Sequence, residues 1–255
     1  MPASLFDLKG HVAVVTGGNK GIGLGMAQGL ARAGADVAVW SRTQADNESA
    51  AAELAKHGVR TLPVACDIAS EESVVEACAT TVAQLGRIDS CFANAGFGDA
   101  YHPLKASLER WRKVLEVNLD GTFLTLREVS KHMVERGGGG KLVTISSITE
   151  RFGAAKQPGY AASKAALGAL VRSLAIELAR HDIQVNNLQP GWIETDATEP
   201  MRDNELLSTT VMKRTPARRW GDPKDFEGIA VYLASDASRF HTGDTLCIDG
   251  GYSIF

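Results

Sequence analysis

The chain has 255 residues, which suits one large α/β domain with a buried core and is short for two domains. Its formal net charge is −3, so the charge balance gives no sign of a nucleic-acid-binding protein. No stretch is long and apolar enough to span a bilayer, and the first residues lack the basic segment and apolar run of a signal peptide. We therefore expect a cytoplasmic protein without a membrane or nucleic-acid partner.

The cysteines and histidines give no indication of a metal centre. The six histidines are scattered, and the cysteines form no CxxC pair. Three of the four cysteines lie in apolar runs typical of strands, so we interpret them as small buried thiols. The four are Cys66, Cys78, Cys91 and Cys247.

Apolar runs typical of strands alternate with longer helical patterns along the whole chain. Several runs are continuously hydrophobic, as expected for a parallel sheet that is covered on both faces. The predicted strands are Val12–Thr16, Asp36–Trp40, Arg60–Cys66, Asp89–Ala93, Lys141–Ser147, Gln184–Gln189 and Thr245–Ile248. The predicted helices lie near residues 21–33, 45–57, 71–86, 108–135, 160–180 and 222–235. This alternation implies right-handed crossovers and a doubly wound α/β fold.

Two segments need a separate interpretation. Gly137–Gly140 lies between a predicted helix and a strand, and we interpret it as a flexible helix exit rather than a linker. The segment from about Thr195 to Pro216 interrupts the alternation and is rich in Thr, Met and Leu. We interpret it as an irregular, mobile flap over a site, because long insertions in compact domains are usually functional.

The first predicted strand runs directly into the sequence TGGNKGIG, residues 16–23, and a helical pattern follows. Gly17, Gly21 and Gly23 let the backbone turn tightly and approach a pyrophosphate, while the helix N-terminus offers free N–H groups. Because the turn follows a strand and opens a helix, it indicates a dinucleotide site rather than a simple tight turn. We expect cofactor contacts from this turn, at Gly17, Asn19, Lys20, Gly21, Ile22 and Gly23.

The spacing G-x-x-x-G-x-G after a threonine resembles the short-chain dehydrogenase/reductase family. The resemblance implies a single Rossmann-type domain over residues 1–255. It also implies a doubly wound parallel sheet of about seven strands, in the order 3-2-1-4-5-6-7, with helices on both faces.

The end of the second predicted strand bears on which nicotinamide cofactor binds. An acidic residue there would hydrogen-bond the adenosine ribose and repel a 2′-phosphate, but the sequence has Ser41 and Arg42 instead. Arg42 can present its planar fork to a phosphate, Ser41 can donate a hydrogen bond, and Lys20 adds a second cation. These basic positions match the family pattern associated with NADP, so we expect NADP(H) rather than NAD(H). The alternative is that both cations are solvated surface charges.

Two further motifs extend the resemblance toward the adenine and the middle of the sheet. In the family, the aspartate after the third strand contacts the adenine, and here it is Asp67, with the backbone of Ile68 beside it. A turn aspartate is the alternative. Ala93-Asn94-Ala95-Gly96 resembles the NNAG motif, with Ala93 in place of the first Asn. Asn94 keeps the position that the family assigns to strand stabilisation and cofactor contact, and Ala95 and Gly96 follow it.

Tyr160 and Lys164 stand four residues apart in a helical pattern and therefore share one face. A nearby ammonium favours the phenolate and lowers the pKa of a tyrosine, which can then exchange a proton with an alcohol or a nascent alkoxide. YxxxK alone is common, so the neighbouring motifs carry the assignment.

Ser147 ends the fifth predicted strand, where ligands bind in open α/β sheets, and its hydroxyl can hydrogen-bond a substrate oxygen. Ser146 is the competing candidate, but the family spacing to Tyr160 favours Ser147. Asn118 matches the fourth catalytic residue of the family, which holds a water that links the lysine to solvent. The alternative for Asn118 is a helix-kink asparagine that bonds its own backbone.

The end of the sixth predicted strand completes the resemblance, which covers essentially the whole chain. Pro190 and Gly191 resemble the family's PG motif, and Thr195 follows at the position that contacts the nicotinamide end. Ile193 would supply backbone contacts to the carboxamide. We therefore expect a hydride-transferring oxidoreductase acting on a ketone or secondary alcohol, commonly a homotetramer in this family.

The substrate is less well defined. We expect it to contact Phe97–Tyr101, Ile148–Phe152, Gln157, Trp192 and the flap from Met201 to Met212. This apolar and charged mixture permits a sugar acid, a polyol, a β-ketoacyl thioester or a cyclic ketone. The 3-oxoacyl-carrier-protein reductase and gluconate dehydrogenase branches resemble the chain best. An NAD-dependent sugar-acid or polyol dehydrogenase, a non-catalytic NADP sensor and a methyltransferase are the alternatives.

Overall fold

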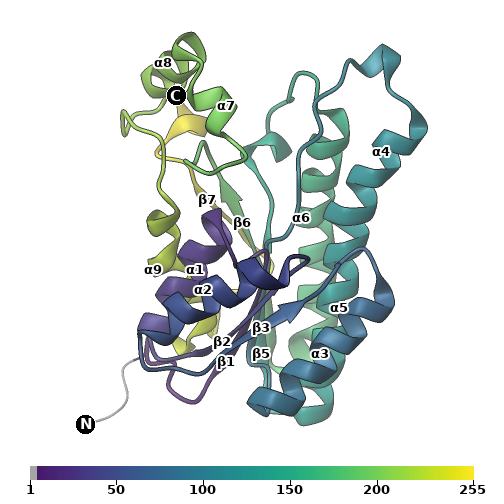
Figure 1. Ribbon diagram of the computed structural model, residues 1–255, viewed down its shortest axis with the longest axis vertical. Coiled ribbons are helices and arrows are strands. Elements are labelled where there is room, and N and C mark those ends of the chain that lie inside the picture. Colours follow the sequence, from purple (N-terminus) through teal and green to yellow (C-terminus); the bar gives the residue numbers. More distant parts are fainter. Residues whose placement is uncertain (1–4) are drawn as a thin grey trace.

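The computed structural model describes residues 5–255 and contains a seven-stranded, all-parallel sheet (Figure 1). The strand order is β3-β2-β1-β4-β5-β6-β7, as predicted. The strands are β1 (Val12–Thr16), β2 (Asp36–Ser41), β3 (Thr61–Ala65), β4 (Ser90–Ala93), β5 (Gly140–Ile145), β6 (Ile183–Pro190) and β7 (Thr245–Ile248). The predicted strands are confirmed, and their ends differ from the observed ones by no more than two residues.

Alternate residues of each central strand contribute to two separate hydrophobic cores. In β1, Val12 and Val14 point into one core, while Ala13 and Val15 point into the other. All of these side chains are buried, because a crossover helix covers each face of the sheet. The continuous apolar runs in the sequence follow from this two-sided burial.

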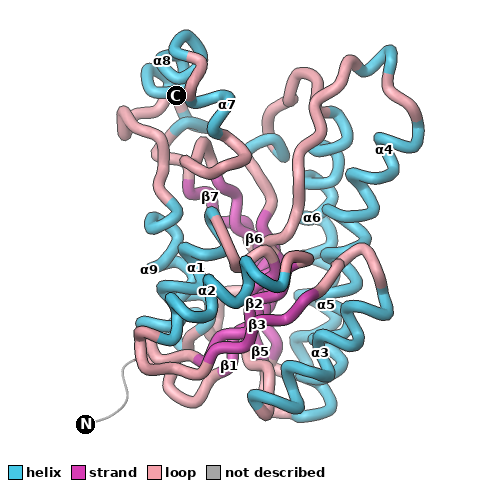
Figure 2. The backbone as a smooth tube through the Cα atoms, in the orientation of Figure 1, coloured by secondary structure: helices cyan, strands magenta, loops and turns pink. Residues whose placement is uncertain are grey.

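Helices cover both faces of the sheet, as Figures 1 and 2 show. Residues of α3 (Glu71–Leu85), α5 (Gly121–Arg136) and α6 (Pro158–Leu178) complete the first core. Residues of α1 (Gly21–Arg32), α2 (Gln44–Ala55) and α9 (Glu227–Ala234) complete the second. This layered arrangement is the predicted doubly wound fold.

Polar caps and glycines set several helix ends. The Ser70 hydroxyl accepts a hydrogen bond from Ser73 N and caps α3, and Gly86 ends that helix in the left-handed conformation. Ser107 caps α4 (Leu108–Leu115) in the same way, through Arg110 N. The predicted helix near 108–135 consists of α4, a π-helical turn over Glu116–Asp120, and α5. A π turn inserts one extra residue and is often found at functional sites.

The segment predicted to be an irregular flap contains two helices, so that part of the prediction is wrong. They are α7 (Glu199–Arg202) and α8 (Glu205–Arg214), both at one end of the molecule in Figure 1. The Asn204 side chain caps α8 by accepting from Leu207 N, and the Trp220 indole donates to the Ser208 hydroxyl. The segment is therefore a small helical layer that packs on the chain that follows it.

Gly137–Gly140 connects α5 directly to β5, as expected for a helix exit rather than a linker. Gly137, Gly138 and Gly139 all adopt positive φ angles between 71° and 78°, which favour glycine. A Cβ atom on Gly139 would lie 2.6 Å from the carbonyl oxygen of Asp182. The run allows α5 to turn into β5 within the space that the neighbouring chain leaves.

Among residues 5–255, no helix is both long and apolar enough to cross a membrane. Three of the predicted buried thiols, Cys66, Cys78 and Cys91, are buried, while Cys247 is half-buried, and none forms a disulfide. Burial raises the pKa of the Cys66 and Cys78 thiols to about 11, so these groups stay protonated and unreactive near neutral pH.

The close packing of α1 on the chain before α9 gives a stability prediction. A Cβ atom on Gly25 would lie 2.1 Å from the carbonyl oxygen of Pro223, so Gly25→Ala must displace backbone. We expect Gly25→Ala to lower the free energy of unfolding by about 1–3 kcal/mol. Gly228→Ala is the matched control, because Gly228 lies in helix α9 with no atom within 4 Å of an added Cβ. It should be neutral or stabilising by about 0.5 kcal/mol. Urea unfolding of both variants tests this, and equal stabilities would contradict it.

Candidate active site at the carboxyl edge of the sheet

The carboxyl ends of β1 and β4 are joined by side-chain hydrogen bonds at the point where the strand order reverses. The Thr16 hydroxyl accepts from the backbone N–H groups of Asn94 and Ala95, both at 3.0 Å. The Asn94 amide in turn donates to the carbonyl oxygens of Thr16 and Gly17, at 3.0 and 3.3 Å. In open α/β sheets this reversal point is where ligands bind. Asn94 thus fixes the glycine turn, as predicted for strand stabilisation.

The glycine turn has no room for side chains at the predicted positions. Gly17 and Gly21 have φ angles of 62° and 53°, in the region that favours glycine. A Cβ on Gly23 would lie 2.2 Å from the Gly17 carbonyl oxygen. Helix α1 begins here without a side-chain cap and without an acidic residue in its first turn. Its N-terminal N–H groups and its dipole therefore suit an anionic group such as a pyrophosphate.

The end of β2 presents one exposed cation without a protein partner. Arg42 is exposed and forms no hydrogen bond or ion pair with the chain from residue 5 onward. The Ser41 hydroxyl, which we predicted to meet a phosphate, donates to the Asn47 side chain at 2.5 Å. Lys20 pairs with Asp196 at 3.5 Å, and both side chains are exposed. The structure therefore leaves Arg42 available and directs Lys20 toward the segment before α7.

Asp67 has the hydrogen-bonding pattern of a turn aspartate. One carboxylate oxygen accepts from Ala69 N at 3.0 Å. Ile68 is buried, and its backbone and side chain pack on the start of α5, where a Cβ on Gly121 would lie 2.9 Å away. A contact of Asp67 or Ile68 with adenine stays a prediction.

Ser147 and Tyr160 face each other, from the end of β5 and the first turn of α6. Burial raises the pKa of the Tyr160 phenol and interaction with the Ser147 side chain lowers it in part, so these two side chains are neighbours. The Ser147 hydroxyl also accepts from Thr149 N at 3.2 Å. Ser146 points the other way, where its hydroxyl donates to the Leu188 carbonyl oxygen. Of the two serines, Ser147 is therefore the one that the structure places beside the phenol.

Lys164 lies one helical turn after Tyr160 and is only 5% exposed. Its Nζ atom donates to the carbonyl oxygen of Ile145 at 2.7 Å and lies 5.7 Å from the centre of the Tyr160 ring. Helix α6 thus brings the predicted pair to the end of β5, with the ammonium and the phenol on the same side of the helix.

Burial moves both pKa values toward the neutral forms. It lowers the pKa of Lys164 from 10.5 to about 8. Burial raises the pKa of Tyr160 above its ordinary value of 10.0, and the interaction with Ser147 offsets only part of this rise. The expectation of a lowered Tyr160 pKa is therefore not met, because loss of hydration raises the pKa of the phenol by more than Ser147 lowers it.

Asn118 lies in the π turn, is fully buried and does not bond its own backbone through its side chain. Its amide donates to the Phe97 carbonyl oxygen and accepts from Phe97 N, both at 2.9 Å. It also donates to the Ser163 hydroxyl at 3.1 Å. A Cβ on Gly96 would lie 3.0 Å from the Asn118 side-chain oxygen and 3.3 Å from Lys164 Nζ, so both groups border the same backbone atom. The predicted four-residue set is therefore assembled at one place.

The chain after β6 closes against the glycine turn. Pro190 ends β6, and Gly191 must be glycine, because a Cβ there would lie 2.6 Å from the Asp249 side chain. The Ile193 carbonyl oxygen accepts from the Thr198 hydroxyl at 2.6 Å. The Thr195 methyl group would lie 3.1 Å from a Cβ on Gly21. Thr195, predicted to contact the nicotinamide, therefore lies next to Gly21, predicted to contact the pyrophosphate.

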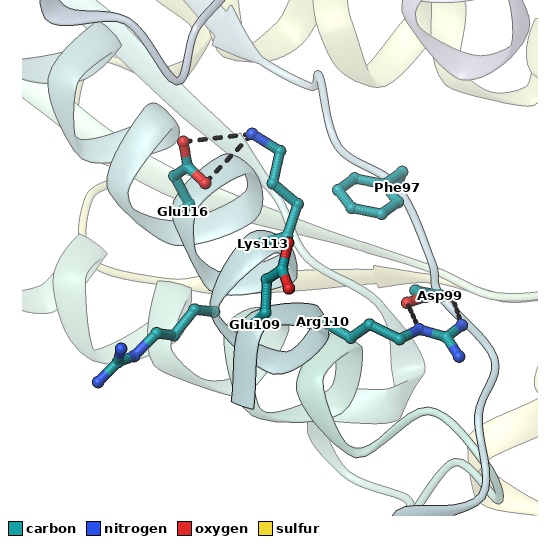
Figure 3. A pocket seen from close by; sticks show the side chains of 7 residues that line it. Phe97, Asp99, Glu109, Arg110, Lys113 and Glu116 are labelled. Carbon is teal, nitrogen blue, oxygen red and sulfur yellow. Dashed lines mark hydrogen bonds and ion pairs between the residues drawn. The ribbon is translucent and has the colours of Figure 1, made fainter. Parts of the chain in front are cut away.

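Two surface hollows lie outside this constellation. One of about 570 Å³ lies along α4 and the loop after β4 (Figure 3), and includes Phe97 and Asp99 of the predicted substrate region. Its charged side chains mostly pair with each other, as in Asp99–Arg110 and Lys113–Glu116. Its lining is Phe97, Asp99, Glu109, Arg110, Arg112, Lys113 and Glu116. The other, of about 500 Å³, lies between α1, the end of α2 and residues 222–227. Neither hollow includes Ser147, Tyr160 or Lys164.

Three residues that hold the site together were not singled out from the sequence. Thr16 links β1 to β4, Asn47 supports the end of β2 through bonds to the Ser41 and Val64 carbonyl oxygens, and Ser163 links α6 to Asn118. Thr16 and Ser163 are polar residues inside the glycine-turn and Tyr160–Lys164 motifs, so the sequence does carry a signal for them. Asn47 carries no sequence signal, because its partners are backbone groups.

Known proteins match nearly the whole length of this chain. A family model described as Enoyl-(Acyl carrier protein) reductase matches residues 17–253. A 2-dehydro-3-deoxy-D-gluconate 5-dehydrogenase from Formosa agariphila is 37% identical over 253 residues, covering 98% of this chain and 96% of that protein.

Two solved structures share the fold closely. A short-chain type dehydrogenase/reductase from Mycobacterium marinum superposes with a TM-score of 0.93 at 36% identity, covering 98% of both chains. A gluconate 5-dehydrogenase from Burkholderia cenocepacia, solved in complex with NADP and tartrate, gives a TM-score of 0.93 at 35% identity, again over 98% of both chains. The chain belongs to the short-chain dehydrogenase/reductase family.

Proposed function

We propose that this protein transfers a hydride between NADP(H) and a ketone or secondary alcohol. The observation that carries the proposal is the meeting of Tyr160, Ser147 and Lys164 beside an uncapped, glycine-bordered helix N-terminus. A proton donor, an oxygen-binding hydroxyl and an anion site at one sheet edge are the parts that carbonyl reduction needs. Family membership and the NADP complex of the Burkholderia relative support the same activity.

The residues present fit NADPH. The α1 N-terminus and the turn through Gly17, Gly21 and Gly23 would hold the pyrophosphate, and the free Arg42 would meet the 2′-phosphate. The remaining contacts that we propose come from Asn19, Lys20, Ile22, Ser41, Asp67, Ile68, Asn94, Ala95, Gly96, Tyr160, Lys164, Pro190, Gly191, Ile193 and Thr195. When bound, NADPH supplies the hydride.

In the reductive direction, the substrate oxygen lies between the Ser147 hydroxyl and the Tyr160 phenol. Ser147 hydrogen-bonds this oxygen while Tyr160 gives it a proton, so that the alkoxide never carries a full charge. The Ser147 and Tyr160 hydroxyl groups lie on regular elements, at the end of β5 and in the first turn of α6. Their positions are therefore set before the substrate binds. In the oxidative direction the same phenol accepts the alcohol proton.

The opposite pKa shifts favour return of the proton to Tyr160. The pKa of Lys164 is about 8, whereas that of Tyr160 is above 10. The proton is therefore held more tightly by Tyr160 than by Lys164, whereas with ordinary values of 10.0 and 10.5 the two groups would hold it about equally. Asn118, which borders Lys164 at Gly96, completes the route by which Lys164 regains its proton from solvent.

We further propose that residues 1–255 act as one domain in which residues 195–216 form a substrate flap. The Lys20–Asp196 ion pair and the Thr195 contact with Gly21 support a link between the flap and the cofactor turn. We also propose a cytoplasmic homotetramer. Phe123 and Ile176 on α5 and α6, which are 41% and 81% exposed, support association through these helices.

The names of the relatives point to the first substrates to test. The Formosa and Burkholderia proteins are both named for gluconate-type sugar acids. A polyhydroxy acid or its keto form is therefore the substrate class that we propose for this chain.

Removing the phenol oxygen tests the mechanism. Tyr160→Phe should lower turnover by about 10²–10⁴-fold, because no other group donates the proton to the substrate oxygen. NADPH affinity should change little. Steady-state NADPH oxidation and NADPH titration measure the two quantities, with Tyr232→Phe, remote from the site beside His241, as the control. Near-normal turnover in Tyr160→Phe would contradict the mechanism.

Reversing the charge at residue 42 tests the cofactor assignment. Arg42→Asp should lower the ratio of kcat/KM for NADPH to that for NADH by at least tenfold, since a carboxylate repels the 2′-phosphate and can bind the ribose. Arg239→Asp, an equal charge change at another exposed arginine, should leave the ratio unchanged. An unaltered preference in Arg42→Asp would show that the end of β2 does not select the cofactor.

The buried ammonium gives a pH-dependent stability prediction. Because folding lowers the pKa of Lys164 from 10.5 to about 8, its charge destabilises the fold fully below pH 8 and not at all above pH 10.5. Wild-type stability should therefore rise relative to Lys164→Met between these pH values, by at most about 3 kcal/mol. Urea unfolding of both proteins at several pH values measures this difference. A difference that is constant with pH would mean that Lys164 titrates normally in the folded protein.

A further inference from the structure

Four aromatic rings from distant parts of the chain meet near the loop that follows β5. The ring centroids of Trp192 and Trp220 lie 5.4 Å apart, and those of Trp192 and Tyr252 lie 6.3 Å apart. The rings of Phe152 and Tyr252 are also 6.3 Å apart, with an edge-on geometry. This cluster joins the loop after Ser147, the chain after β6, the chain after α8 and the C-terminal turn.

Arg214, the last residue of α8, is held by two of these rings. Its Cζ atom lies 4.3 Å from the ring centre of Tyr252 and 5.0 Å from that of Phe152. Aromatic faces attract a planar cation, but they accept none of its N–H hydrogen bonds in the guanidinium plane. Its one hydrogen bond within residues 5–255 is a long one, 3.4 Å from Nη1 to the Tyr252 hydroxyl. Most of the guanidinium donors therefore remain available to a ligand.

No carboxylate of the described chain neutralises Arg214. Neighbouring arginines do have such partners: Arg202 pairs with Glu194 at 3.6 Å and Arg219 pairs with Asp225 at 2.6 Å. Arg214 is half-buried, and a partly buried cation without a counter-charge is unfavourable unless something else supplies the negative charge. A bound anion is the simplest source of that charge, and a guanidinium is especially suited to the two oxygens of a carboxylate.

A second observation in the same cluster also indicates a polar ligand. The Trp192 indole N–H is buried and has no acceptor among residues 5–255, and the Thr149 hydroxyl is in the same situation. Buried donors without partners are rare in folded proteins. A polyhydroxy acid carries a carboxylate at one end and hydroxyl oxygens along its chain, so one molecule can supply both kinds of acceptor.

The arginine is connected to the proposed reacting groups through the loop that carries Phe152. Phe152 N donates to the Ile148 carbonyl oxygen at 3.0 Å, and Ile148 directly follows Ser147. Thr149 N donates to the Ser147 hydroxyl, and Trp192 directly follows Gly191. Arg214 therefore stacks on the loop that begins at Ser147.

We propose that Arg214 binds the carboxylate of a hydroxy-acid or keto-acid substrate whose reacting oxygen is held by Ser147 and Tyr160. The inference rests on the proposed function and narrows it, because it makes Arg214 the residue that selects sugar acids over neutral sugars and ketones. Arg214 lies within the flap predicted from the sequence, about residues 195–216, two residues after the Met201–Met212 stretch that was expected to contact the substrate.

Binding to the NADP⁺-loaded protein tests the proposal directly. D-gluconate, with tartrate as a second probe, is titrated by calorimetry into the wild type, Arg214→Met and Lys213→Met. Lys213 is the matched control, since it is an exposed cation next to Arg214 on the same helix. We expect Arg214→Met to weaken gluconate binding by about tenfold or more, as loss of charged hydrogen bonds does, and Lys213→Met to change it by less than twofold. Melting temperatures verify that each variant folds, and Arg214→Lys, which keeps the charge, replaces Arg214→Met if that variant does not.

Kinetics provide a readout that a merely structural role would not give. We expect Arg214→Met to lower kcat/KM for 5-keto-D-gluconate at least tenfold more than for a neutral keto-sugar such as D-fructose, mainly through KM. Equal losses for the acid and the neutral ketone, equal weakening in Arg214→Met and Lys213→Met, or no binding of either acid to the wild type would overturn the proposal. Absence of turnover with every carbonyl compound would instead overturn the proposed function, and gluconate binding would still decide the role of Arg214.

Discussion

The buried ammonium of Lys164 is the constraint on which the site depends. Its 2.7 Å hydrogen bond to the Ile145 carbonyl oxygen ties helix α6 to the end of β5. Because Tyr160 precedes Lys164 by four residues, the same bond holds the phenol opposite Ser147. The cost of removing the ammonium from water appears as its lowered pKa, and that lowered pKa is what makes Lys164 a ready proton donor. One interaction thus sets both the geometry and the acidity of the site.

The other half of the edge is held by neutral hydrogen bonds. Thr16 and Asn94 connect the ends of β1 and β4, so the glycine turn and the chain before Gly96 are hydrogen-bonded to each other. The Asn118 side-chain amide hydrogen-bonds both the backbone N–H and the backbone carbonyl of Phe97. Asn118 lies in the π turn at residues 116–120 and is buried there. The turn that suits a pyrophosphate and the residues that suit a carbonyl are therefore connected by the backbone of one loop, residues 94–97.

Much of this arrangement could be predicted from the sequence, because it depends on local patterns. Continuous apolar runs predicted the strands, since a parallel sheet buries both faces, and the spacing of Tyr160, Lys164 and Ser147 predicted their meeting at one strand end. The helices of the flap could not be predicted from apolar periodicity, because α8 buries only Val211 and presents the rest of its surface to the solvent or to small contacts. The direction of the Tyr160 pKa was wrong for a related reason. Desolvation of the phenol depends on all the groups that pack around it. The spacing of Tyr160 and Lys164 in the sequence gives no information about that packing.

The segment from Thr195 to Arg214 connects the two ends of the proposed ligand site, which explains why it carries charges at both of its own ends. At its start, Asp196 pairs with Lys20 of the glycine turn, and this exposed pair at 3.5 Å is weak enough for either partner to exchange it for another. At its end, Arg214 lies between two rings that hold its position without neutralising its charge. A phosphate that attracts Lys20 and a carboxylate that attracts Arg214 would therefore act on the same short segment. Helices α7 and α8 lie between these two points, so most of the segment is helical rather than irregular.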